Sequence, residues 1–487
     1  MFQLEEATIA EMQQAMERGE CSSFELVQQY LKRIAAYDQQ GPKINSVLEL
    51  NPDALHLAEA SDAERCAGML RGPLHGIPVL LKDNIQTADK MHTSAGSIAL
   101  ADHYASEDAF LVTRLREAGA IILGKANMTE WANFMAEGMI AGYSSRGGQV
   151  LNPYGHDFFA GGSSTGSAVA VAANLTAVSV GTETSGSIIS PAINNSLVGI
   201  KPTLGRISRS GVIPLSHSQD TAGPLARTVA DAAILLGAMC GIDSKDPVTR
   251  CAAGTEVSDF TEFLDKSGLQ GARIGVPRNG FHDELDEEQN ELFDQVLLEL
   301  ADAGAQLIDP ADIASAEELS RFRSSVLQHD FKADINAFLS KLPPQLPVHS
   351  LKELIAFNEA NADQALKYGQ KRLIAAEQTS GLLKEPKYIE DRLTDIRLSR
   401  TEGIDRTLEK HRLDALLFPE TLGDTIAAKA GYPSMAVPAG YLQDGRPFGI
   451  MFVGAAFSEP VLIKLAYAFE QLRARRKPPI LEKGNEQ

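Results

Sequence analysis

Helix patterns and short apolar strand patterns stand next to one another towards both ends of this chain. In AFLVTRLREAGAIILGKANM, residues 109–128, apolar side chains at helical spacing lead to Gly119, and an apolar run of strand type, 120–123, follows. Near the C-terminus the same rhythm appears in strand-like segments and a final helix pattern, at 413–419, 432–440, 449–455 and 458–472. Strands from the two ends most simply share one sheet. The rhythm therefore predicts an α/β fold in one large domain.

Composition limits what such a domain binds. Across 487 residues, 45 lysines and arginines stand against 64 aspartates and glutamates, a formal net charge of −19. Nucleic acid and anionic lipid both require a basic face, so we expect neither a nucleic-acid nor a membrane partner. Four cysteines without metal-ligand spacing indicate a reducing compartment. The N-terminus lacks a signal-peptide pattern, and no apolar run reaches about 18 residues. These features predict a cytoplasmic protein.

A stretch of small residues, GGSSTGSAVAVAANLTAVSVGTETSGSIISPA at 161–192, places many hydroxyl groups beside an apolar segment, 168–180. Its glycine-rich start has the composition of an anion-binding turn, but the lysine that completes a phosphate loop does not follow. The chain also lacks the H-E-x-x-H metal pattern. The hydroxyls are therefore better read as candidate nucleophiles, which need a base to accept their proton.

Lys82 is the candidate base. It ends the apolar run IPVLL at 77–81, which is of buried-strand type, and the C-terminal ends of strands are where α/β sheets place their sites. The alternative is a lysine that leaves a strand for solvent. If Lys82 is buried, desolvation lowers its pKa toward the value of about 7–8 typical of a catalytic lysine. Asp83 would oppose that shift, so we expect its carboxylate to point away.

Several motifs together resemble the amidase signature family over nearly the whole chain. They are LLKDN at 80–84, GKANMTEWAN at 124–133, GGSSTGS at 161–167, GTETSGSI at 181–188, VGIKPT at 198–203, GPLARTVADAA at 223–233 and GYPSMAVP at 431–438. Within that family the chain is most similar to bacterial peptide amidases, through LRGPLHGIP, TSAGS, SQDTAGP and SEPVLIKLAYAFEQ.

The resemblance implies a Ser–cisSer–Lys triad with Ser187 as nucleophile, Ser163 as proton relay and Lys82 as base. It implies a cis peptide bond between Gly162 and Ser163. The backbone N–H groups of Thr184, Ser185, Gly186 and Ser187 are the implied oxyanion hole. No metal or cofactor is implied. Ser190 and Pro191, read as N-cap and first helical residue, would place a helix N-terminus nearby.

The family resemblance also implies one domain with a central mixed β-sheet covered by helices on both faces. On this view residues 1–70 are an N-terminal helical segment packed on the core, 71–240 are the signature core, and 310–430 form the variable substrate side. The implied reaction is hydrolysis of a carbon–nitrogen amide bond through an acyl-enzyme. Peptide C-terminal amides are the first candidate substrates, followed by small aryl or aliphatic amides.

This sequence departs from the common family motif around the nucleophile. Glu183, Ser185 and Ile189 stand where the motif commonly has Asp, Gly and Arg. Because the triad is intact, these changes bear on substrate identity more than on activity. Two other functions remain open: the A subunit of a tRNA-dependent amidotransferase, and a catalytically silent family member. Neither the substrate's acyl and amine groups nor the oligomeric state can be read from the sequence.

Overall fold

The computed structural model describes residues 2–481, and its centre is an eleven-stranded sheet. From one edge to the other the strands are β1 (Val47–Leu50), β3 (Ile121–Ala126), β2 (Pro78–Lys82), β6 (Val178–Glu183), β8 (Thr221–Ala226), β7 (Val198–Lys201), β12 (Ser434–Tyr441), β13 (Pro447–Val453), β11 (Ala415–Pro419), β9 (Arg273–Gly275) and β10 (Gln306–Ile308). A separate hairpin pairs β4 (Tyr143–Ser144) with β5 (Gly148–Gln149).

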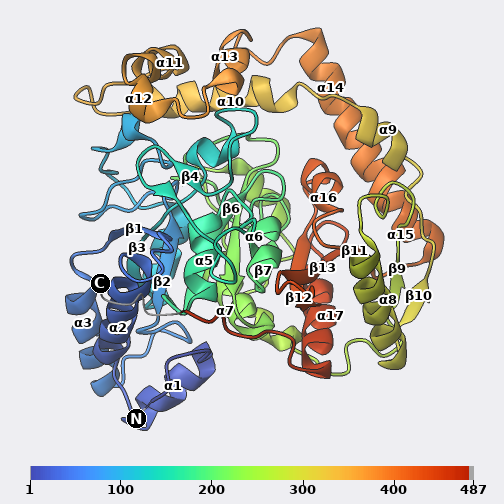
Figure 1. Ribbon diagram of the computed structural model, residues 1–487, viewed down its shortest axis with the longest axis horizontal. Helices are drawn as coiled ribbons and strands as arrows, with labels where there is room; N and C mark the ends of the chain where they lie inside the picture. The colour runs from blue at the N-terminus through green and yellow to red at the C-terminus, as the bar shows by residue number, and fades with distance from the viewer. Residues whose placement is uncertain (1, 482–487) are drawn as a thin grey trace.

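The sheet is mixed, and it joins strands from both ends of the chain. β2 lies parallel to both β3 and β6, and β9 lies parallel to β10 and β11. The strands between these two groups pair antiparallel, and β7 meets β12 across more than two hundred residues of sequence. Figure 1 shows the early strands and the late strands side by side in one layer. The prediction of one shared sheet is confirmed.

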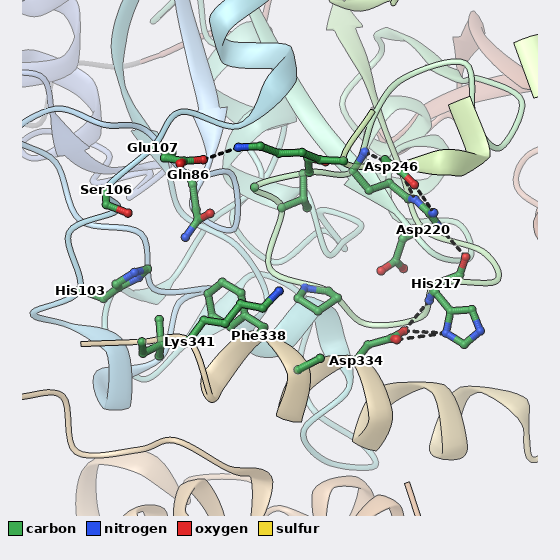
Figure 2. A pocket seen from close by; sticks show the side chains of 18 of the residues that line it. Gln86, His103, Ser106, Glu107, His217, Asp220, Asp246, Asp334, Phe338 and Lys341 are labelled. Carbon is green, nitrogen blue, oxygen red and sulfur yellow. Dashed lines mark hydrogen bonds and ion pairs between the residues drawn. The ribbon is translucent and has the colours of Figure 1, made fainter. Parts of the chain in front are cut away.

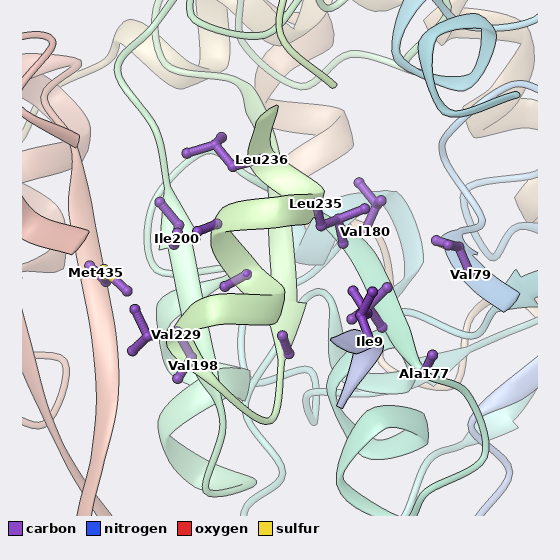
Figure 3. Close-up of a cluster of buried hydrophobic side chains, with 14 of the residues drawn as sticks. Ile9, Val79, Ala177, Val180, Val198, Ile200, Val229, Leu235, Leu236 and Met435 are labelled. Atoms are coloured by element: carbon purple, nitrogen blue, oxygen red, sulfur yellow. The ribbon is translucent and has the colours of Figure 1, made fainter. Parts of the chain in front are cut away.

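Helices cover both faces of the sheet, as expected. Along β12 the side chain of Met435 joins one core cluster, with α7 and α17, whereas Ala436 joins another, with α5 and α6. Figure 3 shows Met435 beside Val229 of α7 in the first cluster. The helices in the body of the protein are α1 (Ile9–Glu17), α2 (Ser23–Arg33), α3 (Ala54–Cys66), α4 (Phe110–Glu117), α5 (Thr165–Ala172), α6 (Ile189–Asn194), α7 (Val229–Met239), α8 (Glu287–Asp302), α16 (Asp424–Ala430) and α17 (Glu459–Leu472).

A second group of helices lies across one end of the sheet, along the top of Figure 1. The group and its continuation comprise α9 (Ala316–Arg321), α10 (Val326–Leu339), α11 (Leu351–Ala360), α12 (Ala362–Ala365), α13 (Lys371–Glu377), α14 (Pro386–Ile396) and α15 (Asp405–His411). Helices α10, α11 and α13 share a core cluster with the loops at 95–100 and 131–139. These loops follow strands β2 and β3, so the helical group packs over the C-terminal ends of those strands.

The N-terminal segment is not wholly helical, which corrects the prediction for residues 1–70. Residues 47–50 form the edge strand β1, which pairs antiparallel with β3. Four residues, VLEL, are too few to show a strand period, and leucine and glutamate favour helices in isolation. Pairing with β3 decides the outcome. Within residues 2–481, no helix is long and apolar enough to cross a membrane.

Candidate active site

Lys82 is the last residue of β2 and lies completely buried. Its Nζ lies 2.8 Å from the Ser163 Oγ, 2.9 Å from the Thr182 Oγ1 and 3.1 Å from the Thr182 carbonyl oxygen. Thr182 belongs to β6, the strand paired with β2, so the sheet itself fixes two of these three neighbours. The alternative in which this lysine leaves the strand for solvent is therefore wrong.

Burial lowers the pKa of Lys82 to about 7, and the negative charges of Asp220 and Glu183 oppose that shift. Asp83 follows in sequence but faces the other way, as expected. Its carboxylate accepts hydrogen bonds from the N–H groups of Ser94 and Gly96 and lies 3.5 Å from the Arg146 guanidinium. An amine with a pKa of about 7 is partly neutral at neutral pH, which is the state that a general base requires.

Ser163 lies two residues before the start of α5, and its side chain is fully buried. The peptide bond between Gly162 and Ser163 is cis, as the family resemblance implies. Thr129, in the loop after β3, donates its N–H to the Ser163 carbonyl oxygen at 3.1 Å. The structure thus brings Lys82 and Ser163 into direct contact.

Ser187 lies in the segment between β6 and α6, beside the start of α5. Its carbonyl oxygen accepts the N–H of Ser164 at 3.2 Å, and the residue is 7% exposed. Among residues 2–481 no hydrogen bond links the hydroxyls of Ser163 and Ser187, so the contact expected between relay and nucleophile is not formed here. Catalytic hydrogen bonds often tighten only when substrate is bound.

The four N–H groups of the oxyanion segment, which we define as residues 184–187, donate to no acceptor within the described part of the chain. The two following N–H groups, of Ile188 and Ile189, donate instead to the Glu183 carboxylate at 2.7 and 3.1 Å. By accepting these two N–H groups, the Glu183 carboxylate holds the turn between β6 and α6 in place. The N–H groups of the segment remain available to an outside acceptor such as a developing oxyanion.

The start of α6 corrects one prediction. The helix begins at Ile189, so Ser190 lies inside its first turn and is not its N-cap. The Glu183 carboxylate accepts the first N–H groups of the helix and so replaces the cap that a serine would supply. Pro191 fits the first turn, where a missing N–H costs nothing.

Gly186 adopts a φ of +75°, and a Cβ at this position would collide with Oδ2 of Asp424. Substituting Gly186→Ala should therefore displace the N–H donors of the oxyanion segment, which are worth about 10²- to 10³-fold each in turnover. We expect kcat to fall by about that factor, measured as amide hydrolysis at saturating substrate. Gly68→Ala is the matched control, because Gly68 has a φ of +73° but open space around it. A Gly186→Ala enzyme as fast as the Gly68→Ala enzyme would contradict this description.

Three further polar residues surround the site and were not assigned a role from the sequence. Thr182 contacts the Lys82 amine, Asp220 accepts a hydrogen bond from the Thr184 hydroxyl at 2.6 Å, and Asp424 abuts Gly186. Burial, together with the negative charge of Glu183, raises the pKa of Asp424 to about 7. Thr182 lies within GTETSGSI and Asp220 within SQDTAGP, so both stood in recognised motifs. No sequence signal pointed to Asp424.

Comparison with known proteins assigns this chain to a class. The amidase family model matches residues 25–463, and the chain belongs to the amidase family. It is an amide hydrolase. A probable amidase of Arabidopsis thaliana is 43% identical over 98% of this chain and 92% of its own length. The A subunit of the glutamyl-tRNA(Gln) amidotransferase of Halorhodospira halophila is 33% identical, over 96% of this chain and 98% of its own.

Solved structures of two amidases are similar to this chain in both sequence and fold. The native peptide amidase of Stenotrophomonas maltophilia is 47% identical and superposes with a TM-score of 0.94, covering 99% of this chain and all of that one. An amidase family protein of Bacillus anthracis is 42% identical, with a TM-score of 0.93, covering 98% of this chain and 93% of its own. Over the residues that these matches cover, the chain has the fold of these amidases.

Proposed function

We propose that this protein hydrolyses the C-terminal amide of peptides, or small aryl or aliphatic amides, through a triad of Ser187, Ser163 and Lys82. The observation that carries the proposal is the fully buried Lys82 amine, with a pKa of about 7, placed 2.8 Å from the Ser163 hydroxyl. A lysine held near neutrality beside a serine is arranged to accept a proton from it.

The neighbours of Lys82 match the requirements of a neutral amine. Its two N–H bonds are satisfied by the carbonyl oxygen and the hydroxyl of Thr182. Its lone pair is then directed at the Ser163 hydroxyl, which donates to it. Ser163 in turn accepts the proton of Ser187, whose Oγ attacks the amide carbonyl carbon. The relay carries one proton from the nucleophile to the base.

Attack moves negative charge onto the amide oxygen, and the N–H groups of the oxyanion segment supply donors for it. The protonated Lys82 then returns its proton through Ser163 to the departing nitrogen, so that the C–N bond breaks with release of a neutral amine or ammonia. Water attacks the resulting Ser187 ester by the same proton route and frees the acid. Each step uses only side chains and backbone groups of this chain.

The similarity to a peptide amidase supports a peptide amide as the substrate. We place substrate selection on the helical side, at residues 310–430, because α10 and α13 pack over the strand ends near Lys82. Asp424, which also belongs to this stretch, brings a carboxylate to the oxyanion segment. The departure of Ser185 from the common glycine falls at the same place.

The test is ammonia release from a panel of peptide amides, aryl amides and aliphatic amides, with the corresponding free acids as blanks. We expect release from at least the peptide amides, catalysed by the purified chain alone. The 33% identity to the amidotransferase A subunit makes that subunit's function the second candidate. Activity that appears only after partner subunits and misacylated tRNA are added would favour it. A chain inactive in both assays would be a silent family member.

Chelation should leave the hydrolysis rate unchanged. In the proposed mechanism Lys82 is the base, and backbone N–H groups stabilise the negative charge on the amide oxygen. The mechanism therefore requires no metal. Within residues 2–481 no group of three potential His, Cys, Asp or Glu ligands comes together. The measurement is the rate after exhaustive dialysis against EDTA. A loss of activity that Zn²⁺ or Mn²⁺ restores would contradict the prediction.

A further inference from the structure

The segment 215–220, between β7 and β8, holds the oxyanion segment at two atoms of one residue. The Thr184 hydroxyl donates to Oδ1 of Asp220 at 2.6 Å, and Nε2 of Gln219 donates to the Thr184 carbonyl oxygen at 3.0 Å. Thr184 is therefore fixed at its side chain and at its backbone. Fixing Thr184 also restricts the positions of its neighbours in the oxyanion segment.

Asp220 is itself held by its own segment. Its second carboxylate oxygen accepts the N–H groups of Leu215 at 2.7 Å and Ser216 at 2.8 Å, which closes the segment into a tight loop. The loop is anchored on helix α10, where the hydroxyls of Ser216 and Ser218 both donate to Asp330, at 2.7 and 2.6 Å. A continuous chain of hydrogen bonds thus runs from the helical group to the oxyanion segment.

Asp220 also lies between two cavities. The larger, of about 590 Å³, is bounded by α10 and the loops at 86–107 and 209–217, and Figure 2 shows Asp220 on its wall near His217. A much smaller cavity shares Asp220 with it and is lined by Thr182 and Thr184. Asp220 therefore stands between the large cavity and the neighbours of the Lys82 amine.

We propose that Asp220 is a positioning residue of the amidase reaction: it holds Thr184 and so aligns the oxyanion N–H groups, and its negative charge acts through space on Lys82. The inference rests on the proposed function, because it assigns Asp220 a part in the same triad chemistry. Neither role requires Asp220 to touch the substrate.

The charges around the two residues decide the direction of the effect. Lys82 faces two carboxylates, Glu183 from β6 and Asp220, which raise its pKa against the larger lowering effect of burial. Asp220 faces Asp334 from α10 and Arg209 from the loop before β8, and burial raises its own pKa to about 6. Removing the charge of Asp220 leaves burial less opposed, so the pKa of Lys82 must fall further below its usual range.

Asp220→Asn is the first test, because it removes the charge and preserves the shape. The amide oxygen can accept the N–H groups of Leu215 and Ser216, while its NH₂ donates to the rotatable Thr184 hydroxyl. We expect the rising limb of the pH–kcat profile to move to lower pH by about half a unit or more. Glu107→Gln is the control, since Glu107 is an exposed carboxylate on the same large cavity and pairs with Lys245. Its limb should stay in place.

Thr184→Val tests the alignment role separately. The variant keeps the volume of the side chain but removes the hydroxyl that Asp220 holds, so kcat should fall about 10-fold or more with little change in KM. Thr184→Ser restores a hydroxyl and should recover most of the loss. Equal losses in the valine and serine variants would overturn the alignment role.

An unmoved limb in Asp220→Asn would overturn the electrostatic role. If Asp220→Asn does not fold, the valine and serine pair still decides the alignment role. Lys82→Arg is assayed in parallel to separate the role of Asp220 from the proposed function. Inactive Lys82→Arg with an unmoved limb would refute the role of Asp220 and leave the proposed function standing, whereas active Lys82→Arg would refute the proposed function itself.

Discussion

Lys82→Arg should be as inactive as Lys82→Ala, with kcat reduced by about four orders of magnitude in both. A guanidinium keeps its proton at every pH at which a protein is folded, so arginine can supply charge at this position but cannot act as a base. In the native enzyme, burial brings the pKa of Lys82 to about 7. Neutral amine therefore accumulates as the pH rises through that value, and kcat should rise with it and then stay level.

The measurement is the pH–kcat profile of the native enzyme together with turnover by the two variants. Thermal unfolding of each variant shows whether loss of the buried side chain has cost the fold. An arginine variant that retains activity in a folded state would mean that Lys82 contributes only charge. The base would then have to be another group near Ser163.

Ser187→Ala should abolish turnover and leave the fold intact, because alanine lacks the oxygen that forms the acyl-enzyme and the small change at a nearly buried site creates little strain. We expect kcat to fall by about five orders of magnitude or more, as for other nucleophile deletions. Substrate binding should persist, since the donors of the oxyanion segment are backbone groups that alanine retains.

Ser190→Ala is the matched control. Ser190 lies three residues further on, within the first turn of α6, and its removal should leave kcat close to that of the native enzyme. Binding of a peptide amide to the Ser187→Ala variant can be followed by calorimetry to show that the site is intact. The reverse pattern, with Ser190→Ala inactive and Ser187→Ala active, would assign the nucleophile to the helix.

Much of the fold follows from local signals in the sequence. Strands β2, β3, β12 and β13 contain short apolar runs bounded by glycine or proline, and these local features identify them without tertiary information. Edge strand β1 escapes the same method because four residues carry no usable period. Lys82 is predictable from the sequence for a related reason. Its place at the end of a buried strand is a local fact, and burial then determines its pKa.

The parts of the site that the sequence does not reveal come from distant segments. Asp424 reaches Gly186 from α16, more than two hundred residues further along the chain. The small residues of 161–192 also serve packing as well as chemistry. A Cβ at Gly166 would collide with the carbonyl oxygens of Asn127 and Ser46, so α5 needs glycine to approach the backbone of neighbouring segments. Only the folded arrangement shows such contacts.

The most direct test of the proposed mechanism is to find which residue carries the acyl group during turnover. Acid quenching with a slowly deacylated ester or amide substrate, followed by proteolysis and mass spectrometry, locates the adduct. We predict one acyl group per chain, on the peptide that contains Ser187, and none in the Ser187→Ala variant. An adduct on Ser163, Ser190 or Lys82, or turnover by single-step attack of water with no adduct at all, would contradict the mechanism.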